Sequence, residues 1–496
     1  MDQESTILLE ALETQRNLHS NLTSVSHKSD FGQYFTPGEV AMFMAEMFPD
    51  AKGSDIRLLD PGAGIGGLAC AFTLNMNERV EGLHYNIDCY EIDDKVFVKL
   101  ANNLHDLSSF ADVEYAVFHE DFIEKAVDHL LQFNKPKYTH VILNPPYKKM
   151  HSSSNHRKLL RLVDIEVVNL YSAFVSMSLE LLQNDGYLVA IIPRSFCNGT
   201  YYLPFRKHIL ANAVIRRIHL FESRNSIFKN DSVLQENIII MLQKSDTIDK
   251  VEVSYSKDQS VGNSISKHID YQDIVDLNSW ELIIKIPHET TNSFPIVETS
   301  FKQLGIMVST GPVVDFRNRE YINSETTDMS IPLIYPQNIH RFQVLWPSDK
   351  GLQASIILNS ETKKQLYETG FYVVVRRFSS KEEKRRIVAG LVDPEDYKTG
   401  YLAFENHLNV FHNCGKGLET EIAYGLLVYL NSEGFDHEFR VFSGHTQVNV
   451  SDLKRMTYPS LSQLKELGVR LQKSKFNYQE FEDLIAEVIN GNKQSS

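Results

Sequence analysis

The sequence has few cysteines, no long apolar run and no signal-like start. Its four cysteines, Cys70, Cys89, Cys197 and Cys414, form no close pairs and adjoin no histidine cluster. This spacing argues against a disulfide framework and a zinc knuckle, so we expect a reducing, cytoplasmic location and no bound metal. Runs of about 18 uncharged apolar residues are missing, so we expect neither secretion nor a membrane partner.

The composition is that of an ordinary folded protein, and the length exceeds that of one domain. Hydrophobic residues make up 42% and charged residues 23% of the 496 residues, which predicts two or three compact units. The formal net charge of −14 argues against unspecific binding of nucleic acid along the whole surface. Residues 151–245 nevertheless hold 11 Lys and Arg against 7 Asp and Glu, so this segment is locally basic.

Hydrophobic spacing predicts alternating helices and strands in the first half of the chain. Residues 5–22 have apolar residues at helical spacing, and we assign 1–30 to an N-terminal helix. Residues 31–245 are predicted to form an α/β domain with a mainly parallel sheet, because short apolar runs alternate with helical segments. The expected strands are Ile56–Leu59, Tyr85–Tyr90, Glu114–Phe118, His140–Leu143, Tyr187–Ile192 and 236–243.

The second half of the chain has a different rhythm. Residues 246–290 begin with a polar, weakly hydrophobic stretch and are predicted to be a linker. Residues 291–496 combine scattered strand-like pieces with proline and glycine turns and a final helical segment, so we predict a second, less regular α+β domain. Its strand-like pieces are Ile306–Ser309, Tyr372–Val375 and Val441–Phe442.

A glycine-rich turn follows the first predicted strand. Its sequence is Asp60-Pro61-Gly62-Ala63-Gly64, and Gly67 stands three residues further on, before a helical segment. Glycines at such a turn let a ligand approach the backbone closely. The three glycines also fit the pattern G-x-G-x-x-G, so a nicotinamide dinucleotide site and a purely structural turn are both alternatives here.

Acidic residues follow the next two predicted strands. Glu91 and Ile92 come directly after Tyr85–Tyr90, where a carboxylate can accept both hydroxyl protons of a nucleoside ribose; an exposed strand-end acid is the alternative. Asp121 and Phe122 follow the third strand, where the acid suits an adenine amino group and the aromatic ring suits the adenine face. A helix cap at Asp121 is the structural alternative.

The fourth predicted strand runs directly into Asn144-Pro145-Pro146-Tyr147. Two consecutive prolines fix the backbone and remove two amide donors, so the loop is rigid and rich in acceptors. If the Asn144 side-chain oxygen and the Pro145 carbonyl each accept one hydrogen of an exocyclic amine, the nitrogen lone pair can point at an electrophile. Tyr147 would stack on the base, which has to leave a duplex to enter such a pocket.

These blocks, in this order, resemble motifs I to IV of S-adenosylmethionine-dependent amino-methyltransferases, specifically the N6-adenine DNA class. Upstream, Phe35-Thr36-Pro37 resembles the motif that precedes the glycine turn in the gamma order and closes over the methionine end of the cofactor. The resemblance implies a Rossmann-like methyltransferase fold over 31–245, S-adenosylmethionine (SAM) as the cofactor and double-stranded DNA as the partner.

The same resemblance assigns roles to individual residues. The residues expected to bind the cofactor are Phe35, Thr36, Pro37, Asp60, Pro61, Gly62, Gly64, Glu91, Ile92, Asp121, Phe122 and Asn144. The expected catalytic residues are Asn144, Pro145, Pro146 and Tyr147, and the expected base-stacking residues are Tyr147 and Phe228.

The C-terminal blocks Val308–Phe316, Arg376–Arg386 and Ser443–Val448 are similar to long modification methylases of the BsuBI/PstI type. On this resemblance, 291–496 is a target-recognition domain that selects a palindromic hexamer, with CTGCAG as the first guess. Methylation would protect that site from a cognate restriction endonuclease, which we expect to be genetically paired with this protein but not a stable subunit.

Two groups of basic residues are candidates for DNA contacts. Lys148 and Lys149 follow Tyr147 and begin a predicted basic rim that continues with His151, His156, Arg157, Lys158 and Arg161. The densest basic cluster of the second domain contains Arg376, Arg377, Lys381, Lys384, Arg385 and Arg386. Phosphate neutralisation or guanine recognition is the functional interpretation, and a solvated helix face is the alternative.

Other functions stay open at this point. Protein-glutamine and RNA amino-methyltransferases also use Asn-Pro-Pro-Tyr but usually lack a long C-terminal domain, and cytosine-N4 enzymes generally have Ser in place of Asn144. A bifunctional restriction-modification enzyme would need a metal-binding Asp…Glu-x-Lys set, for which the sequence offers only Glu382-Glu383-Lys384. A nicotinamide oxidoreductase would need a hydride-transfer acid or base after Asn144, and none is evident.

Overall fold

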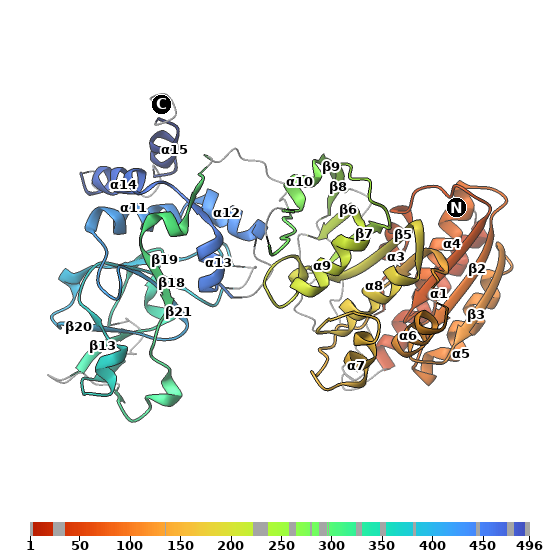
Figure 1. Ribbon diagram of the computed structural model, residues 1–496, viewed down its shortest axis with the longest axis horizontal. Helices are drawn as coiled ribbons and strands as arrows, with labels where there is room; N and C mark the ends of the chain where they lie inside the picture. The colour runs from red at the N-terminus through yellow and green to blue at the C-terminus, as the bar shows by residue number, and fades with distance from the viewer. Residues whose placement is uncertain are drawn as a thin grey trace. The chain divides into compact units, whose positions relative to one another are not determined.

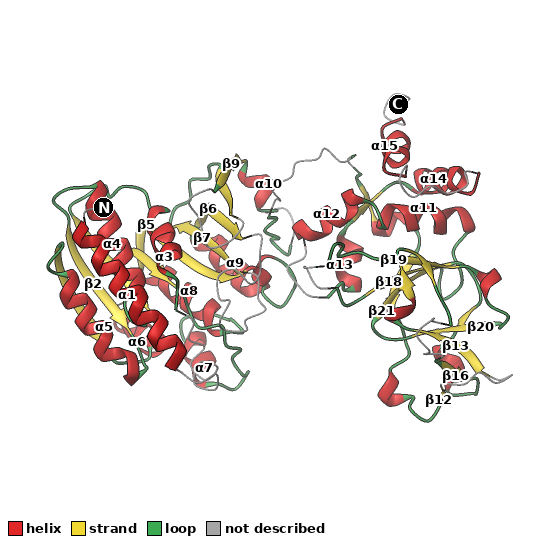
Figure 2. Cartoon of the chain, turned by 180° about the vertical axis from the view of Figure 1, so that it is seen from behind, coloured by secondary structure: helices red, strands yellow, loops and turns green. Residues whose placement is uncertain are grey.

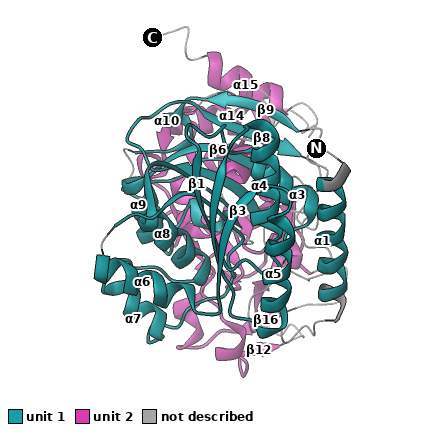
Figure 3. Cartoon of the chain, turned by 90° about the vertical axis from the view of Figure 1, so that its right-hand side faces the viewer, with its two compact units in different colours: residues 1–287 teal, residues 288–496 magenta. Residues whose placement is uncertain are grey.

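The computed structural model of the protein divides into two compact units, residues 1–287 and 288–496 (Figures 1 and 3). The structure describes residues 3–22, 35–133, 135–221, 237–256, 264–277, 280–286, 295, 297–323, 330–347, 354–379, 383–442, 447–473 and 481–491. No helix among these residues is both long enough and apolar enough to cross a membrane.

A large sheet forms the centre of unit 1 (Figure 1). Its strands lie in the order β3 (Asp112–Phe118), β2 (His84–Tyr90), β1 (Asp55–Pro61), β4 (Tyr138–Leu143), β5 (Leu182–Pro193), β7 (Asn237–Gln243), β6 (Val214–Phe221), β8 (Val251–Ser256) and β9 (Ile265–Ile269). Neighbours from β3 to β5 are parallel, whereas β7 runs antiparallel to both β5 and β6. The predicted α/β class with a mainly parallel sheet is confirmed.

Helices cover both faces of this sheet (Figure 2), because its central strands are apolar on both faces. In β4, Val141 and Leu143 join the core on one face, and Ile142 joins the core on the other. One face packs against α6 (Phe122–Phe133), α7 (Asn155–Arg161), α8 (Leu170–Leu181), α9 (Leu203–Asn212) and α10 (Tyr271–Ile274); the other packs against α1 (Gln3–Leu22), α3 (Gly38–Glu46), α4 (Gly67–Arg79) and α5 (Asp94–Leu107).

The predicted strands of this unit agree with the observed strands β1 to β5 and β7, and the predicted helix over 5–22 agrees with α1. α1 is an integral part of unit 1, although the sequence suggested a separate N-terminal element. Leu8 and Leu12 are buried in the same core as the buried residues of α3 and α4.

The prediction of a linker over 246–290 is wrong. β8 pairs with β6 and β9, so the sheet continues into this segment, and α10 buries Tyr271 and Ile274 behind it. The segment looked like a linker because β8 (Val-Glu-Val-Ser-Tyr-Ser) alternates apolar with polar residues and because β9 is an edge strand with no buried residue. An edge strand exposed in this way lacks the apolar run by which the central strands were found.

Unit 2 contains shorter strands in separate sheets. One sheet has the order β11 (Met307–Thr310), β21 (Leu408–His412), β18 (Tyr372–Arg376), β19 (Ala389–Val392), β15 (Phe342–Val344) and β14 (Ile339–His340). Another has the order β12 (Ile322–Asn323), β16 (Ser355–Ile357), β13 (Ser330–Ile334), β20 (Tyr401–Phe404) and β17 (Tyr367–Glu368), and a small pair joins β10 (Thr299–Ser300) to β22 (Thr457–Tyr458).

The α-helices described for unit 2 all lie after residue 419. They are α11 (Thr420–Leu430), α12 (Glu433–Phe442), α13 (Val450–Arg455), α14 (Leu461–Lys473) and α15 (Phe481–Gly491). The predicted strand at Val441–Phe442 is wrong, because these residues end α12. Phe435 and Phe439 are buried one helical turn apart, and this spacing outweighs the local β preference of Val441.

Helices α11 and α14 cross at two glycines. A Cβ atom on Gly425 would lie 2.0 Å from the carbonyl oxygen of Leu464, and one on Gly468 would lie 1.9 Å from the carbonyl oxygen of Glu421. Leu464 lies four residues before Gly468, and Glu421 lies four residues before Gly425. Each glycine therefore contacts the helical turn that precedes the other glycine. The close crossing therefore depends on the missing side chains at both positions.

We expect Gly425→Ala to destabilise unit 2 by about 1–3 kcal/mol, because one added methyl group forces the two helices apart. Urea unfolding followed by circular dichroism measures this effect. Gly400→Ala is the matched control, since a Cβ atom there would meet nothing within 4 Å. Equal stability of the two variants would contradict the proposed packing constraint.

Candidate functional site

The carboxyl ends of parallel strands β1 to β4 surround a pocket with about 1080 Å³ of empty space, part of it open to solvent. Side chains that follow four different strands meet here because parallel strands bring their carboxyl ends to the same edge of the sheet. The predicted site residues that line the pocket are Phe35, Thr36, Gly62, Gly64, Glu91, Ile92, Asp121, Phe122, Asn144 and Pro146. Pro37, Asp60, Pro61, Pro145 and Tyr147 are not among the lining residues.

Glu91 connects the glycine turn to the end of β2. Its Oε2 accepts a hydrogen bond from the Gly64 amide at 2.8 Å, and its Oε1 accepts one from the Asp93 amide at 2.8 Å. Burial raises the pKa of Glu91, and the two amide donors act against this rise. Since each carboxylate oxygen can accept more than one hydrogen, Glu91 has remaining acceptor capacity where it lines the pocket.

Gly64 is the point where the turn and Phe35 touch. The residue has a φ of +55°, and a Cβ atom there would lie 2.6 Å from Cε1 of the Phe35 ring. Only glycine satisfies both the backbone conformation and this close approach. The Phe35 segment is therefore seated directly on the glycine turn.

Asp60 lies near the end of β1, directly before the glycine turn, and is not among the residues that line the pocket. Its side chain is fully buried, and this burial raises its pKa to about 8.

Asp121 has two partners in the structure. Its Oδ1 accepts a hydrogen bond from the Glu124 amide at 3.1 Å, so the helix-cap interpretation holds at the start of α6. Its Oδ2 lies 2.9 Å from Nε2 of His156, a residue that the sequence placed in the basic rim. Burial acts to raise the pKa of Asp121, but His156 and the backbone amides of Glu124 and Ile123 together outweigh it and the pKa is lowered. Asp121 also lines the pocket.

Phe122 belongs to an aromatic group at the wall of the pocket. Its ring centroid lies 5.4 Å from that of Tyr90 and 5.2 Å from that of Phe174. Phe122 is almost completely buried, whereas Ile92 is half exposed. Together, Ile92, Phe122 and Phe174 give one part of the pocket an apolar surface suited to a flat ring.

Asn144 is held by partners on both sides of its amide group. Its Nδ2 donates a hydrogen bond to Oγ1 of Thr36 at 3.1 Å, and its Oδ1 accepts one from the Tyr147 hydroxyl at 3.1 Å. The Tyr147 hydroxyl also lies 3.1 Å from the carbonyl oxygen of Ile191. The Tyr147 ring packs edge-on against Tyr171 with centroids 6.3 Å apart, so in this structure it lies behind Asn144 rather than along the pocket wall.

The predicted basic rim of unit 1 is partly neutralised by local partners. Lys148 and Lys149 are exposed, as expected for residues that meet a phosphate backbone. Arg157 and Arg161 both bind Glu166 instead. The rim is therefore smaller than the sequence suggested.

The basic cluster of unit 2 does not form one exposed face. Arg376 lies 3.8 Å from the carboxylate of Glu383, and Arg377 donates to the carbonyl oxygen of Asn406 at 3.3 Å. Arg385 donates to the carbonyl oxygen of Ser432 at 2.6 Å, and Arg386 is fully buried. Lys384 is exposed. Phe228, Phe31–Tyr34, Lys381–Glu382 and Ser443–Thr446 lie outside the described residues.

Sequence reasoning missed several residues that line the pocket, and two groups of them come from distant helices. The first is α1, which lines it with Leu9, Leu12, Glu13 and Arg16. The second is Phe174 on α8. The apolar spacing of α1 predicted a helix but did not say what the helix packs against, and nothing near Phe174 in the sequence marks it as special.

The chain is similar to proteins of restriction-modification systems. The family described as Eco57I restriction-modification methylase matches residues 68–228. The chain is 43% identical to the type II methyltransferase M.BsuBI of Bacillus subtilis over 456 residues, which cover 90% of each protein. It is 39% identical to the type II methyltransferase M.PstI of Providencia stuartii over 482 residues, which cover 93% of each.

A solved structure shares the fold at low sequence identity. The DrdV–DNA complex has a TM-score of 0.50 and 13% identity, over 94% of this chain and 59% of that one. This likeness concerns the fold alone. The high identity and nearly complete coverage of the two curated relatives decide the family: the chain belongs to the type II methyltransferases that include M.BsuBI and M.PstI.

Proposed function

We propose that the protein transfers a methyl group from SAM to N6 of an adenine that has left the duplex at a short, palindromic DNA site. The observation that carries this proposal is the position of Asn144, whose amide group is fixed at the edge of a pocket that Glu91 also lines. A pocket of this kind brings an amine acceptor and a ribose acceptor into one space. CTGCAG is the first site to test, and protection from a cognate endonuclease is the proposed biological role.

The pocket residues fit SAM. Glu91 offers a buried carboxylate for the ribose hydroxyls, and Ile92, Phe122 and Phe174 offer an apolar wall for the adenine ring. The pocket is also lined by acidic side chains, which favour a cationic ligand such as a sulfonium. The pyrophosphate of a nicotinamide dinucleotide would be repelled by the same side chains, so this alternative is disfavoured.

When bound, SAM supplies an electrophilic methyl group on a positively charged sulfur. Asn144 Oδ1 and the Pro145 carbonyl would each accept one hydrogen of the adenine amine, which directs the nitrogen lone pair toward that methyl group. Transfer would form the nitrogen–carbon bond as the sulfur–carbon bond breaks, with its electron pair left on sulfur, and the nitrogen would release a proton to water. Thr36 would keep the amide of Asn144 from rotating during this step.

Tyr147 would have to change partners to stack on the target base. Its hydroxyl now lies within hydrogen-bond distance of Asn144 and the Ile191 carbonyl. We propose that entry of the base draws the ring away from Tyr171 and leaves Asn144 Oδ1 to the amine. Phe228 stays a second candidate for base stacking.

We propose double-stranded DNA in the cytoplasm as the partner and unit 2 as the target-recognition domain. The exposed side chains of Lys148, Lys149 and Lys384 are suited to phosphate contacts. Arg376, Arg377 and Arg385 already bind acceptors within the protein, so any contact of theirs with DNA would require an exchange of partners. Function without a metal ion and without a stably bound endonuclease stays a prediction.

We expect Asn144→Ala to lower kcat by about 10²–10³-fold, because one acceptor that acts on the amine in the transition state is lost. Affinity for S-adenosylhomocysteine, measured by calorimetry, should stay near that of the wild type. Asn155→Ala is the matched control, since Asn155 is exposed and its amide binds only the Glu124 carboxylate among the contacts described. Wild-type turnover in Asn144→Ala would refute the assignment.

We expect Glu91→Gln to weaken S-adenosylhomocysteine binding by roughly 10- to 100-fold, because hydrogen bonds to a charged acceptor contribute about 1.5–3 kcal/mol. Glu114→Gln, at an exposed position of β3, is the control. Since burial raises the pKa of Glu91, wild-type affinity should fall with decreasing pH earlier than an ordinary Glu would allow, and the variant should lack this fall. Identical pH profiles for the two proteins would count against the ribose role.

A further inference from the structure

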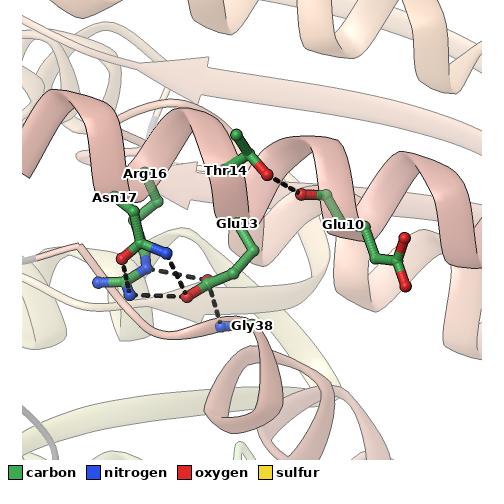
Figure 4. Close-up of polar contacts among 6 residues, drawn as sticks. All are labelled: Glu10, Glu13, Thr14, Arg16, Asn17 and Gly38. Atoms are coloured by element: carbon green, nitrogen blue, oxygen red, sulfur yellow. Dashed lines mark hydrogen bonds and ion pairs between the residues drawn. The ribbon is translucent and has the colours of Figure 1, made fainter.

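Helix α1 is tied to both segments that flank the pocket. Glu13 Oε2 accepts a hydrogen bond from the Gly38 amide at 3.0 Å, directly after Phe35-Thr36-Pro37 (Figure 4). Gln15 exchanges two hydrogen bonds with Asn103, at 3.2 and 3.1 Å, and Asn103 Nδ2 donates to the Ile65 carbonyl in the glycine turn at 2.8 Å. α1 therefore spans the two segments and forms one wall of the pocket.

Arg16 is oriented within this wall. Its Nε and Nη2 donate to the two carboxylate oxygens of Glu13 at 2.9 and 2.7 Å, and Nη2 also donates to Asn17 Oδ1 at 2.7 Å (Figure 4). Burial acts to raise the pKa of Glu13, but Arg16 and the Gly38 amide outweigh it and the pKa is lowered. This leaves Nη1 of Arg16, with its two hydrogens, making no hydrogen bond to any residue that the structure describes.

The charges around the pocket make Arg16 distinctive. Of the described residues that line it, Glu13, Glu91, Glu120 and Asp121 are acidic and Arg16 alone is basic. SAM has a positive sulfonium, a positive ammonium and a single negative group, the carboxylate of its methionine portion. A planar guanidinium with two unused donors is the natural partner for that carboxylate.

We propose that Arg16 binds the carboxylate of the methionine portion of the cofactor, with Glu13 as the positioning residue that orients its guanidinium. The proposal rests on the proposed function, because it takes SAM as the ligand of this pocket. It extends the cofactor site to a residue of α1 that lies more than forty residues before the glycine turn. It also gives Glu13 two linked tasks, holding Gly38 and holding Arg16.

Two ligands that differ only at the amino-acid end test the proposal by calorimetry. S-Adenosylhomocysteine has the carboxylate, whereas 5′-methylthioadenosine has the same nucleoside and a thioether sulfur but no carboxylate. Arg16→Ala should weaken binding of S-adenosylhomocysteine about tenfold or more and leave 5′-methylthioadenosine within about twofold of wild type. Arg16→Lys, which keeps the charge, should recover part of the lost affinity.

The controls separate this proposal from its premise. Glu10 lies on the same helix, and its exposed side chain is directed away from Gly38, so Glu10→Gln is one control (Figure 4). Arg161→Ala, which removes an exposed arginine that binds Glu166, is the other. Neither variant should change the affinity for either ligand. Equal losses for the two ligands in Arg16→Ala, or no loss for either, would overturn the role of Arg16. Failure of the wild-type protein to bind S-adenosylhomocysteine at all would instead overturn the proposed function.

Discussion

The hydrogen bond from the Asn144 amide to Thr36 is the interaction on which the site depends. It joins a loop at the end of β4 to a segment that lies more than a hundred residues earlier in the chain. Thr36 is in turn placed by its neighbours: Phe35 packs on Gly64, and Gly38 is bound by Glu13. The two prolines make the backbone of the loop 144–147 rigid. The hydrogen bond to Thr36 fixes the direction of the Asn144 side-chain amide.

The pocket is thus assembled from segments that are distant in sequence and meet at one edge of a parallel sheet. Glu91 links the first two strands through the Gly64 amide, and Asn103 links α5 to the same turn through Ile65. Each of these polar groups is buried or half-buried and satisfied by a backbone group. Such contacts hold the pocket walls in one arrangement before a ligand arrives, which lowers the cost of binding.

Much of unit 1 could be predicted from the sequence because its central strands, such as β4 and β7, are buried on both faces and read as nearly continuous apolar runs. Asn144, Glu91 and the glycine turn were predictable because each directly follows such a strand. The edge strand β9 and the part of α1 in the pocket were not, because an exposed strand has no apolar signature and a helix pattern does not name its partner. The basic cluster around Arg385 and Arg386 was predicted to contact DNA, yet Arg386 is buried. A run of basic residues in the sequence does not reveal which side chains become buried.

The central claim is that Asn144 and the proline loop that follows it activate the amino group of adenine. The identity of the methylated nucleoside tests this claim most directly. Duplex DNA is incubated with the purified wild-type protein and isotope-labelled SAM, digested to nucleosides and analysed by mass spectrometry. The account predicts label in N6-methyl-2′-deoxyadenosine alone. Label in N4-methyl- or 5-methyl-2′-deoxycytidine, or in the protein rather than the DNA, would contradict it.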